Sequence, residues 1–403
     1  MGGAIAMLML NSRNVVLSGL PTGRRSVVLR LRQGGPEPVT LRPDEALFAR
    51  PGAVIGPSQT VLALERDASI AACAASQIIV PNELDYLGDG DVVAVELERP
   101  AVRVLYRRKS QHNSFLLTER CNHYCLMCSQ PPKDVNDDWI VDELFQAIPL
   151  VSPETRSLGF TGGEPTLLGD RFLRLVRDMR EHLPATALHI LSNGRRFVDP
   201  GFAHAYAAIG HPDAMLGIPI YSASSQTHDY IVQADGAFDE TIRGILNLKT
   251  YGQQVEIRVV IHRQNYAHLP RLAEFIARNL TFVDHVALMG LEMTGFAKAN
   301  IDTLWIDPVD YGQELYEAVA LLEDFGLPTS IFNHQLCTID HRIWPLAVKS
   351  ISDWKNEYRP ECGGCSVREQ CGGFFATGRL RQSQHIRPVA ELEERSGALS
   401  QET

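Results

Sequence analysis

Three cysteines in one short stretch are the residues of this chain best suited to metal chemistry. Cys121, Cys125 and Cys128 have the spacing C-x3-C-x2-C, which supplies three thiolates and no fourth. A [4Fe–4S] cluster normally takes four cysteine ligands, so a three-cysteine loop leaves one iron open for a substrate or cosubstrate. A zinc loop is the alternative. Zinc sites favour two pairs of ligands, however, and no second Cys or His pair follows closely.

A glycine-rich turn follows these cysteines at the distance of one predicted helix. The residues are Gly162, Gly163, Glu164 and Pro165, directly after the strand-like run 158–160. Glycines let the backbone approach a ligand closely and adopt conformations that a Cβ forbids. The Glu164 carboxylate is then a hydrogen-bond acceptor beside that ligand. Taken alone the motif also fits an ordinary turn, and its place after the cysteine loop gives it weight.

Together the two motifs resemble the radical S-adenosylmethionine (SAM) superfamily, and the resemblance runs from about residue 113 to about residue 375. It implies that a cluster on the three catalytic cysteines binds the methionine end of SAM at its open iron and cleaves SAM reductively. It also implies that Glu164 accepts a hydrogen bond from the SAM ammonium group. Cofactor contacts are expected at the turn and at the ends of successive strands: Gly162, Gly163, Glu164, Pro165, Ser192, Asn193, Ser222, Arg258 and Gly290.

Some of these positions have alternative explanations. The Asn-Gly step that ends the third predicted strand also fits an ordinary turn before a helix. Ser222 and Val232 stand where many peptide-modifying relatives carry Asp and Arg, so those side chains do not supply the usual contacts to the SAM carboxylate. Arg258 can replace them, because a guanidinium binds a carboxylate bidentately. The alternative for Arg258 is an internal salt bridge with Glu256 or Glu292.

The middle of the chain alternates short apolar runs with helical patterns. Ile140, Leu144 and Ile148, for example, recur at the spacing of one helix face. Strand–helix alternation predicts an α/β fold with parallel strands and right-handed crossovers. Six units fit the partial (β/α)6 TIM-like barrel that the resemblance implies, over residues 109–326, with its chemistry at the carboxyl ends of the strands. The expected strands are 114–118, 157–160, 187–191, 214–220, 255–261 and 285–290.

A second group of cysteines lies in a predicted C-terminal extension over residues 327–380. Cys362, Cys365 and Cys371 form C-x2-C-x5-C, and Cys337 precedes them by 25 residues. Four thiolates can ligate every iron of a second [4Fe–4S] cluster, which then cannot bind SAM and serves to pass or accept an electron. Structural zinc is the alternative. The group resembles the shortened, one-cluster form of the SPASM extension (the twitch type) of peptide and cofactor maturases.

The two ends of the chain have different patterns. Residues 1–108 contain short β-type runs separated by Gly, Pro and Asp turns, which predicts a small all-β domain, either a barrel or a sandwich. Such a domain can hold a leader peptide by strand addition or can be purely structural. The basic residues from Arg103 to Lys109 are expected in a solvated linker, and residues 381–403 in a flexible tail. The expected N-terminal strands are 14–17, 26–31, 60–64, 77–80, 92–97 and 102–106.

Charge and cysteine usage bound the possible functions. With 38 basic and 48 acidic residues the net charge is −10, which argues against a general nucleic-acid binder. The apolar start, residues 4–10, is too short for a membrane span and lacks the basic region of a signal peptide. Seven of the eight cysteines fall in the two groups, which suits metal-bound thiolates in a reducing cytoplasm.

Four longer stretches resemble the radical SAM maturases of the His-Xaa-Ser repeat peptide system (the HxsC type). This resemblance implies a ribosomally made substrate peptide with His-Xaa-Ser repeats, a sister radical SAM maturase, and a small electron donor such as flavodoxin or ferredoxin. Two other functions stay open. One is a small-molecule radical SAM enzyme of the molybdenum-cofactor type, and the other is a non-enzymatic iron–sulfur or zinc protein that senses redox state. The four stretches are 121–133, 161–169, 287–295 and 352–358.

Overall fold

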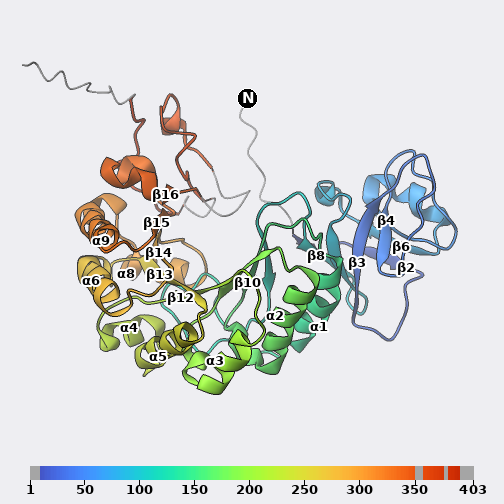
Figure 1. Cartoon of the computed structure of the whole chain (residues 1–403). Coiled ribbons are helices and arrows are strands. Elements are labelled where there is room, and N and C mark those ends of the chain that lie inside the picture. The colour runs from blue at the N-terminus through green and yellow to red at the C-terminus, as the bar shows by residue number, and fades with distance from the viewer. Residues whose placement is uncertain (1–9, 350–356, 376–379, 391–403) are drawn as a thin grey trace, which may run out of the picture.

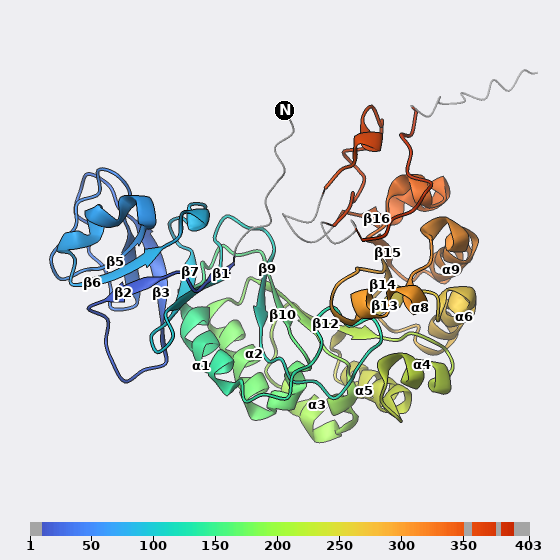
Figure 2. The same cartoon turned by 180° about the vertical axis from the view of Figure 1, so that it is seen from behind.

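Two eight-stranded sheets form the frame of the chain (Figure 1). The computed structural model describes residues 10–349, 357–375 and 380–390. The first sheet is built from the N-terminal residues, and the second is built from strands of the following part of the chain. Helix α1 packs next to the N-terminal sheet (Figure 2). In the described ranges, no helix has the length and apolar character needed to cross a membrane.

The second sheet is a curled half-barrel in which every pair of neighbouring strands is parallel. Its strand order follows the sequence. The expected strands of the partial barrel correspond to β9 to β14, which confirms that part of the fold. Two short strands after residue 326 continue the same sheet, so the predicted extension begins as part of the barrel. The strands are β9 (Asn113–Leu116), β10 (Ser157–Thr161), β11 (Ala187–Leu191), β12 (Ala214–Pro219), β13 (Gln254–Ile261), β14 (His285–Gly290), β15 (Thr329–Phe332) and β16 (Ala347–Val348).

Amphipathic helices cover the outer side of this sheet (Figure 2). In α2, for example, Phe172, Val176 and Met179 recur at helical spacing and are fully buried. Such faces and the strands share one large apolar core. The helices are α1 (Asp138–Ala147), α2 (Asp170–His182), α3 (Pro200–Ala207), α4 (Ser225–Val232), α5 (Ala237–Thr250), α6 (Leu269–Asn279), α7 (Gly295–Ala299), α8 (Ile301–Leu304) and α9 (Gly312–Asp324).

The N-terminal domain is one open, mixed sheet. Its strand order is β1-β8-β7-β3-β4-β5-β6-β2, and the neighbours from β3 to β6 are parallel. The sequence predicts a barrel or a sandwich, and the structure has a single sheet with parallel neighbours. Parallel neighbours require crossover segments, such as the 3-10 helix Glu65–Cys73 between β5 and β6. The strands are β1 (Asn11–Ser12), β2 (Val16–Ser18), β3 (Ser26–Gln33), β4 (Glu45–Phe48), β5 (Thr60–Leu64), β6 (Ser76–Val80), β7 (Val92–Glu96) and β8 (Ala101–Tyr106).

A buried carboxylate on α1 joins this domain to the half-barrel. Glu143 accepts hydrogen bonds from Ser26 Oγ at 2.5 Å and from Arg103 Nη2 at 2.5 and 2.6 Å. The guanidinium groups of Arg25 and Arg103 lie over the Trp139 ring, 4.2 and 4.4 Å from its centre. Arg103 is therefore part of the contact between the domains and not of a solvated linker.

Candidate functional site

The loop with the first three cysteines leaves the carboxyl end of β9 and is held from two sides. On one side the Leu126 N–H donates to the Ile231 carbonyl at the end of α4, at 2.9 Å. On the other side the Phe296 N–H donates to the Cys128 carbonyl at 2.8 Å, and Asn300 Nδ2 donates to the Leu126 carbonyl at 2.9 Å. The loop is therefore fixed at the edge of the half-barrel where the carboxyl ends of the strands lie.

The three thiols of this loop share one partly buried environment. Burial raises the pKa of Cys121 to about 11, and it raises the pKa of Cys125 and of Cys128 as well. Three thiolates at this place therefore need a compensating positive charge, which a metal centre supplies. The donor set fits a [4Fe–4S] cluster, in which each thiolate binds a separate iron. Within residues 10–349, 357–375 and 380–390, no group of three or more His, Cys, Asp or Glu side chains is arranged to hold a single metal ion.

The Gly-Gly-Glu-Pro turn packs directly on the chain that enters the cysteine loop. The Gly163 N–H donates to the Thr118 carbonyl at 2.7 Å, and the Glu164 N–H donates to the Arg120 carbonyl at 2.8 Å. A Cβ on Gly162 would lie 2.4 Å from the Thr118 oxygen, and one on Gly163 would lie 2.0 Å from the Arg120 oxygen. Gly162 also has a φ of 145°. The close approach that these glycines allow is, in this structure, an approach to the protein backbone.

Glu164 is a buried connection between this turn and the end of β11. Its carboxylate accepts hydrogen bonds from Thr166 N (3.0 Å), Thr166 Oγ1 (2.5 Å), Ser192 Oγ (2.8 Å) and Asn193 N (2.6 Å). Burial raises the pKa of Glu164, and these donors oppose the rise. Since a carboxylate has about four acceptor positions, its capacity is largely used inside the protein. Contact of Glu164 with the SAM ammonium group stays a prediction.

Asn193 extends the same connection to the cysteine loop. Its Nδ2 donates to Asn122 Oδ1 at 2.6 Å, and Asn122 lies between the first two cysteines. Pro165 is buried and begins the 3-10 helix Pro165–Leu168, for which Glu164 is the N-cap. The structure therefore brings the turn, the end of β11 and the cysteine loop into one hydrogen-bonded unit.

The end of β12 lies against the same loop through aromatic and imidazole rings. Tyr221 is buried next to Met127 and Cys125 in a small apolar cluster. The Tyr221 N–H donates to His228 Nδ1 at 3.2 Å. The neighbouring Ser222 is buried, and its Oγ accepts a hydrogen bond from the backbone two residues later, in the turn before α4. Contact of Ser222 with SAM is not tested by these bonds and stays a prediction.

Arg258 is paired inside the half-barrel. Its Nη1 donates to Glu256 Oε1 at 2.6 Å, and its Nη2 lies 3.1 Å from Met289 Sδ. Burial acts to raise the pKa of Glu256. The pKa is nevertheless held well below its usual range by hydrogen bonds from His189 and His285 and by the charge of Arg258. The internal ion pair that the sequence allows is thus present, and a contact between Arg258 and SAM stays a prediction.

A cavity of about 60 Å³ lies at the mouth of the half-barrel beside Gly290. A Cβ added to Gly290 would lie 2.6 Å from the carbonyl oxygen of Asn333, in the loop after β15, so there is no room for a side chain at this position. Trp305 and Tyr311 form part of the cavity wall, and Phe374 and Arg381 close it from the C-terminal region. The cavity therefore opens between the barrel and the segment that carries the second cysteine group.

The second cysteine group lines a smaller cavity of about 20 Å³. Val389 N–H donates to Cys365 Sγ at 3.4 Å, and Gly373 N–H donates to Cys371 Sγ at 3.5 Å. Backbone donation to cysteine sulfur is a feature of iron–sulfur sites and influences their potentials. All four predicted ligands line the cavity: Cys337, Cys362, Cys365 and Cys371.

Part of the predicted C-terminal tail packs on this second group. The sequence predicts a flexible tail over residues 381–403, and residues 391–403 lie outside the described ranges. Residues 381–390 run along the cysteine cavity, where the Val389 carbonyl accepts a hydrogen bond from the Ser366 N–H at 3.0 Å. This segment forms a wall of both cavities.

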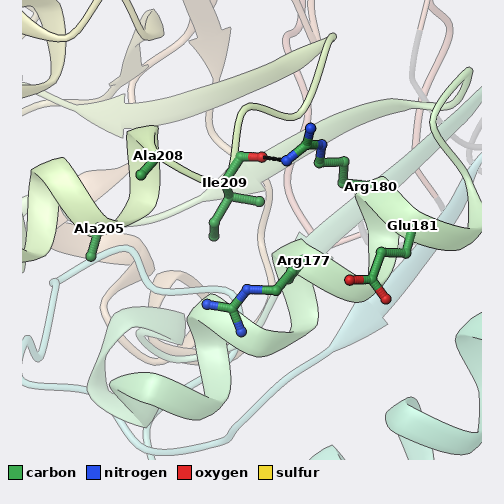
Figure 3. Close-up of a pocket in the computed structure, with 6 residues that line it drawn as sticks. All are labelled: Arg177, Arg180, Glu181, Ala205, Ala208 and Ile209. Atoms are coloured by element: carbon green, nitrogen blue, oxygen red, sulfur yellow. Dashed lines mark hydrogen bonds between the residues drawn. The ribbon is translucent and has the colours of Figure 1, made fainter.

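An open groove on the far side of the half-barrel is unconnected with the site (Figure 3). Arg177 and Arg180 come from the last turns of α2, and Ile209 follows α3. The Arg180 side chain donates to the Ile209 carbonyl. Helix ends of this kind face the amino ends of the strands, opposite the cysteine loop.

Several residues that shape the loop carry no sequence signal strong enough to single them out. Asn122 and Asn300 act through one side-chain hydrogen bond each. A Cβ on Gly295 would lie 2.5 Å from the Cys128 carbonyl oxygen, which requires glycine there. Contacts between residues so far apart in sequence follow no periodicity, so only the three-dimensional structure shows them.

Comparison with known proteins finds similarity in the middle of the chain. The sequence profile of the radical SAM superfamily matches residues 115–276. The Fe-coproporphyrin III synthase of Methanosarcina barkeri is 26% identical over 171 residues, which are 40% of this chain and 39% of that protein. The chain therefore matches less than two thirds of the length of this curated relative.

Solved structures with a similar arrangement have low sequence identity to this chain. SuiB of Streptococcus suis, bound to SAM, is 17% identical with a TM-score of 0.43, over 54% of this chain and 49% of that chain. The protein anSMEcpe, bound to SAM and the Cp18Cys peptide, is 16% identical with a TM-score of 0.48, over 68% of this chain and 91% of that chain. The identification rests on the sequence profile. Residues 115–276, which contain the cysteine loop and the Gly-Gly-Glu-Pro turn, match the radical SAM superfamily.

Proposed function

We propose that this chain is a radical SAM enzyme that modifies a ribosomally made peptide. The observation that carries the proposal is the three-thiol loop, held at the mouth of the half-barrel within a radical SAM domain. When bound, a [4Fe–4S] cluster and SAM supply reductive cleavage of SAM to methionine and a 5′-deoxyadenosyl radical, which abstracts a hydrogen atom from the substrate.

The residues of the chain position and protect that chemistry. Cys121, Cys125 and Cys128 hold three irons, and the Glu164–Asn193 connection fixes the loop that carries them. The apolar cluster around Cys125 excludes water from the back of the loop. Keeping water and stray donors away matters, because they quench a reactive intermediate.

A peptide substrate is supported by the side chains that line the barrel mouth and by the sequence resemblance. The mouth is lined by aromatic rings and by amide side chains, including Asn333 and Gln335. Amides offer both donors and acceptors, as a peptide backbone does. The four stretches that resemble the HxsC type point to a peptide with His-Xaa-Ser repeats. The same resemblance points to a sister maturase and to flavodoxin or ferredoxin as the electron donor in a reducing cytoplasm.

We also propose that the second cysteine group holds a [4Fe–4S] cluster. The support is that Cys337, Cys362, Cys365 and Cys371 line one cavity and that backbone N–H groups point at two of their sulfurs. The Phe374 and Gln335 side chains line this cavity and the cavity at the barrel mouth. A fully ligated cluster at this place can accept the electron that is released when the substrate-derived radical is oxidised to product.

A small-molecule substrate is the second candidate. The observation that favours it is the matched relative, whose name describes a synthase of an iron porphyrin. A radical SAM enzyme of this kind cleaves SAM without any need for a peptide. The two candidates therefore differ in whether the repeat peptide stimulates the reaction.

The test is SAM cleavage by the full chain after anaerobic reconstitution with iron and sulfide. We expect dithionite and SAM to yield 5′-deoxyadenosine, the repeat peptide to raise the rate, and mass spectrometry to find a mass change in a co-expressed repeat peptide. The Cys121→Ala variant is the control and yields none. Absence of 5′-deoxyadenosine from protein that contains intact clusters refutes the proposal. Cleavage that the peptide does not affect favours the second candidate.

A further inference from the structure

His123 lies inside the cysteine loop and contacts two of its three sulfurs. Its backbone N–H donates to Cys121 Sγ at 3.4 Å, and its ring Nδ1 lies 3.9 Å from Cys125 Sγ. The side chain is only 3% exposed. Its Nε2 has no hydrogen-bond partner among the described residues. Neither the fold nor the proposed binding of SAM explains a buried imidazole at this position.

A second buried histidine stands behind the first. Because His228 Nδ1 accepts the Tyr221 N–H at 3.2 Å, the proton of a neutral His228 ring is on Nε2. That N–H group is buried and also has no partner within the described part of the chain. His228 belongs to α4, and the end of α4 holds the cysteine loop through the hydrogen bonds from Tyr124 N–H to the Val232 carbonyl and from Leu126 N–H to the Ile231 carbonyl. The helix that holds the loop thus carries an unpaired buried donor, and the loop itself carries an unpaired buried ring nitrogen.

The contact with Cys125 decides which ring nitrogen of His123 carries the proton. A thiolate bound to iron has no proton to donate, so a ring nitrogen in contact with it must itself be the donor. Nδ1 then carries the proton, and Nε2 is an acceptor. The free N–H of His228 is the complementary group. One contact between the two rings, direct or through a buried water, satisfies both unpaired atoms.

We propose that His123 donates a hydrogen bond from Nδ1 to the Cys125 thiolate and that His228 fixes the tautomer that makes this possible. The inference rests on the proposed cluster at the loop. Hydrogen bonds to cluster sulfur favour the reduced, more negative state and raise the reduction potential. His123 is therefore a positioning residue that makes the cluster easier to reduce.

The proposal is tested directly on the unmutated, reconstituted chain. Protein is made with histidine labelled with ¹⁵N in the imidazole ring only, which leaves the backbone N–H unlabelled. The cluster of interest is reduced with dithionite and recognised as the one whose electron paramagnetic resonance (EPR) signal changes when SAM is added. We expect pulsed EPR to detect a ring-¹⁵N coupling to this cluster. A SAM-responsive signal without such coupling overturns the inference, whereas no SAM-responsive signal at all counts against the proposed function itself.

Variants give a second readout. In His123→Phe the ring-¹⁵N coupling disappears, and the equilibrium between reduced and oxidised cluster shifts about tenfold toward the oxidised form, or about 59 mV for a one-electron couple. His228→Phe weakens the coupling. Tyr124→Phe is the matched control, because Tyr124 is in the same loop and is 54% exposed. It retains the coupling and the potential. A His123→Phe protein with the potential of the Tyr124→Phe protein contradicts the proposal.

Discussion

Replacement of Gly163 by alanine tests how the glycine-rich turn supports the cysteine loop. The added Cβ lies 2.0 Å from the Arg120 carbonyl oxygen and 2.5 Å from its carbon, and both atoms are backbone. Carbon and oxygen atoms approach one another to about 3.3 Å without repulsion. The two backbone segments must therefore move apart by more than about 1 Å.

Such a movement breaks the two hydrogen bonds between the segments. They are Gly163 N–H to Thr118 O at 2.7 Å and Glu164 N–H to Arg120 O at 2.8 Å. Each bond contributes about 0.5–1.5 kcal/mol, and overpacking costs about 1–3 kcal/mol more. We expect the free energy of unfolding of Gly163→Ala to fall by about 2–6 kcal/mol. We also expect the variant to take up less iron at the displaced loop.

The assay is urea unfolding of the iron-free protein, followed by iron analysis after anaerobic reconstitution. Gly312→Ala is the matched control, since its added Cβ meets nothing within 4 Å. Gly312 begins α9, where alanine is stabilising by about 0.5–1 kcal/mol. If Gly163→Ala unfolds at the same urea concentration as Gly312→Ala and binds as much iron, the packing argument for the turn is wrong.

Three further changes test other parts of the structure. Glu143→Ala leaves Arg103 without its buried partner, so we expect a loss of about 3 kcal/mol in urea unfolding, and an unchanged midpoint contradicts the domain contact. The partners of Glu256 lower its pKa, so the stability that it contributes is present above about pH 4.3 and is lost as the pH falls through the lowered pKa. Glu256→Gln should flatten this acid limb of the stability profile, and an identical limb refutes the assignment. Cys365→Ala should lose about four irons per chain and keep the SAM-responsive signal, whereas full iron retention argues against the second cluster.

The sequence is sufficient for the parts of the fold that local patterns determine. Apolar runs and helical spacing locate β9 to β14 and the crossover helices, and the cysteine spacing locates the loop. Most N-terminal strands are also located, but β1 and β4 are missed and the pairing is not predicted. Parallel pairing from β3 to β6 depends on crossovers such as Glu65–Cys73, which leave no periodic trace in the sequence.

The roles of individual site residues follow much less from sequence. Glu164 has the type expected of a ligand acceptor, yet two of its four donors come from Ser192 and Asn193, about 30 residues later. Arg258 has both a pairing partner two residues away and a plausible ligand role, and only the structure shows the pair with Glu256. Which of several possible hydrogen-bond or ion-pair partners a side chain takes depends on their distances in the folded structure.

The C-terminal segment shows how composition alone misleads. Residues 381–390 are polar enough to predict a flexible tail, but their backbone supplies hydrogen bonds to the second cysteine group, such as Val389 N–H to Cys365 Sγ. Backbone donors are the same for every residue except proline, so residue type gives no signal for such a contact.

The central claim is that three thiols hold a cluster whose fourth iron is open to SAM. The most direct measurement is electron–nuclear double resonance on the dithionite-reduced chain with SAM labelled with ¹⁵N at its amino group. We expect a strong ¹⁵N coupling that disappears in Cys125→Ala. A cluster that is fully reduced and shows no coupling to the added nucleotide contradicts the claim.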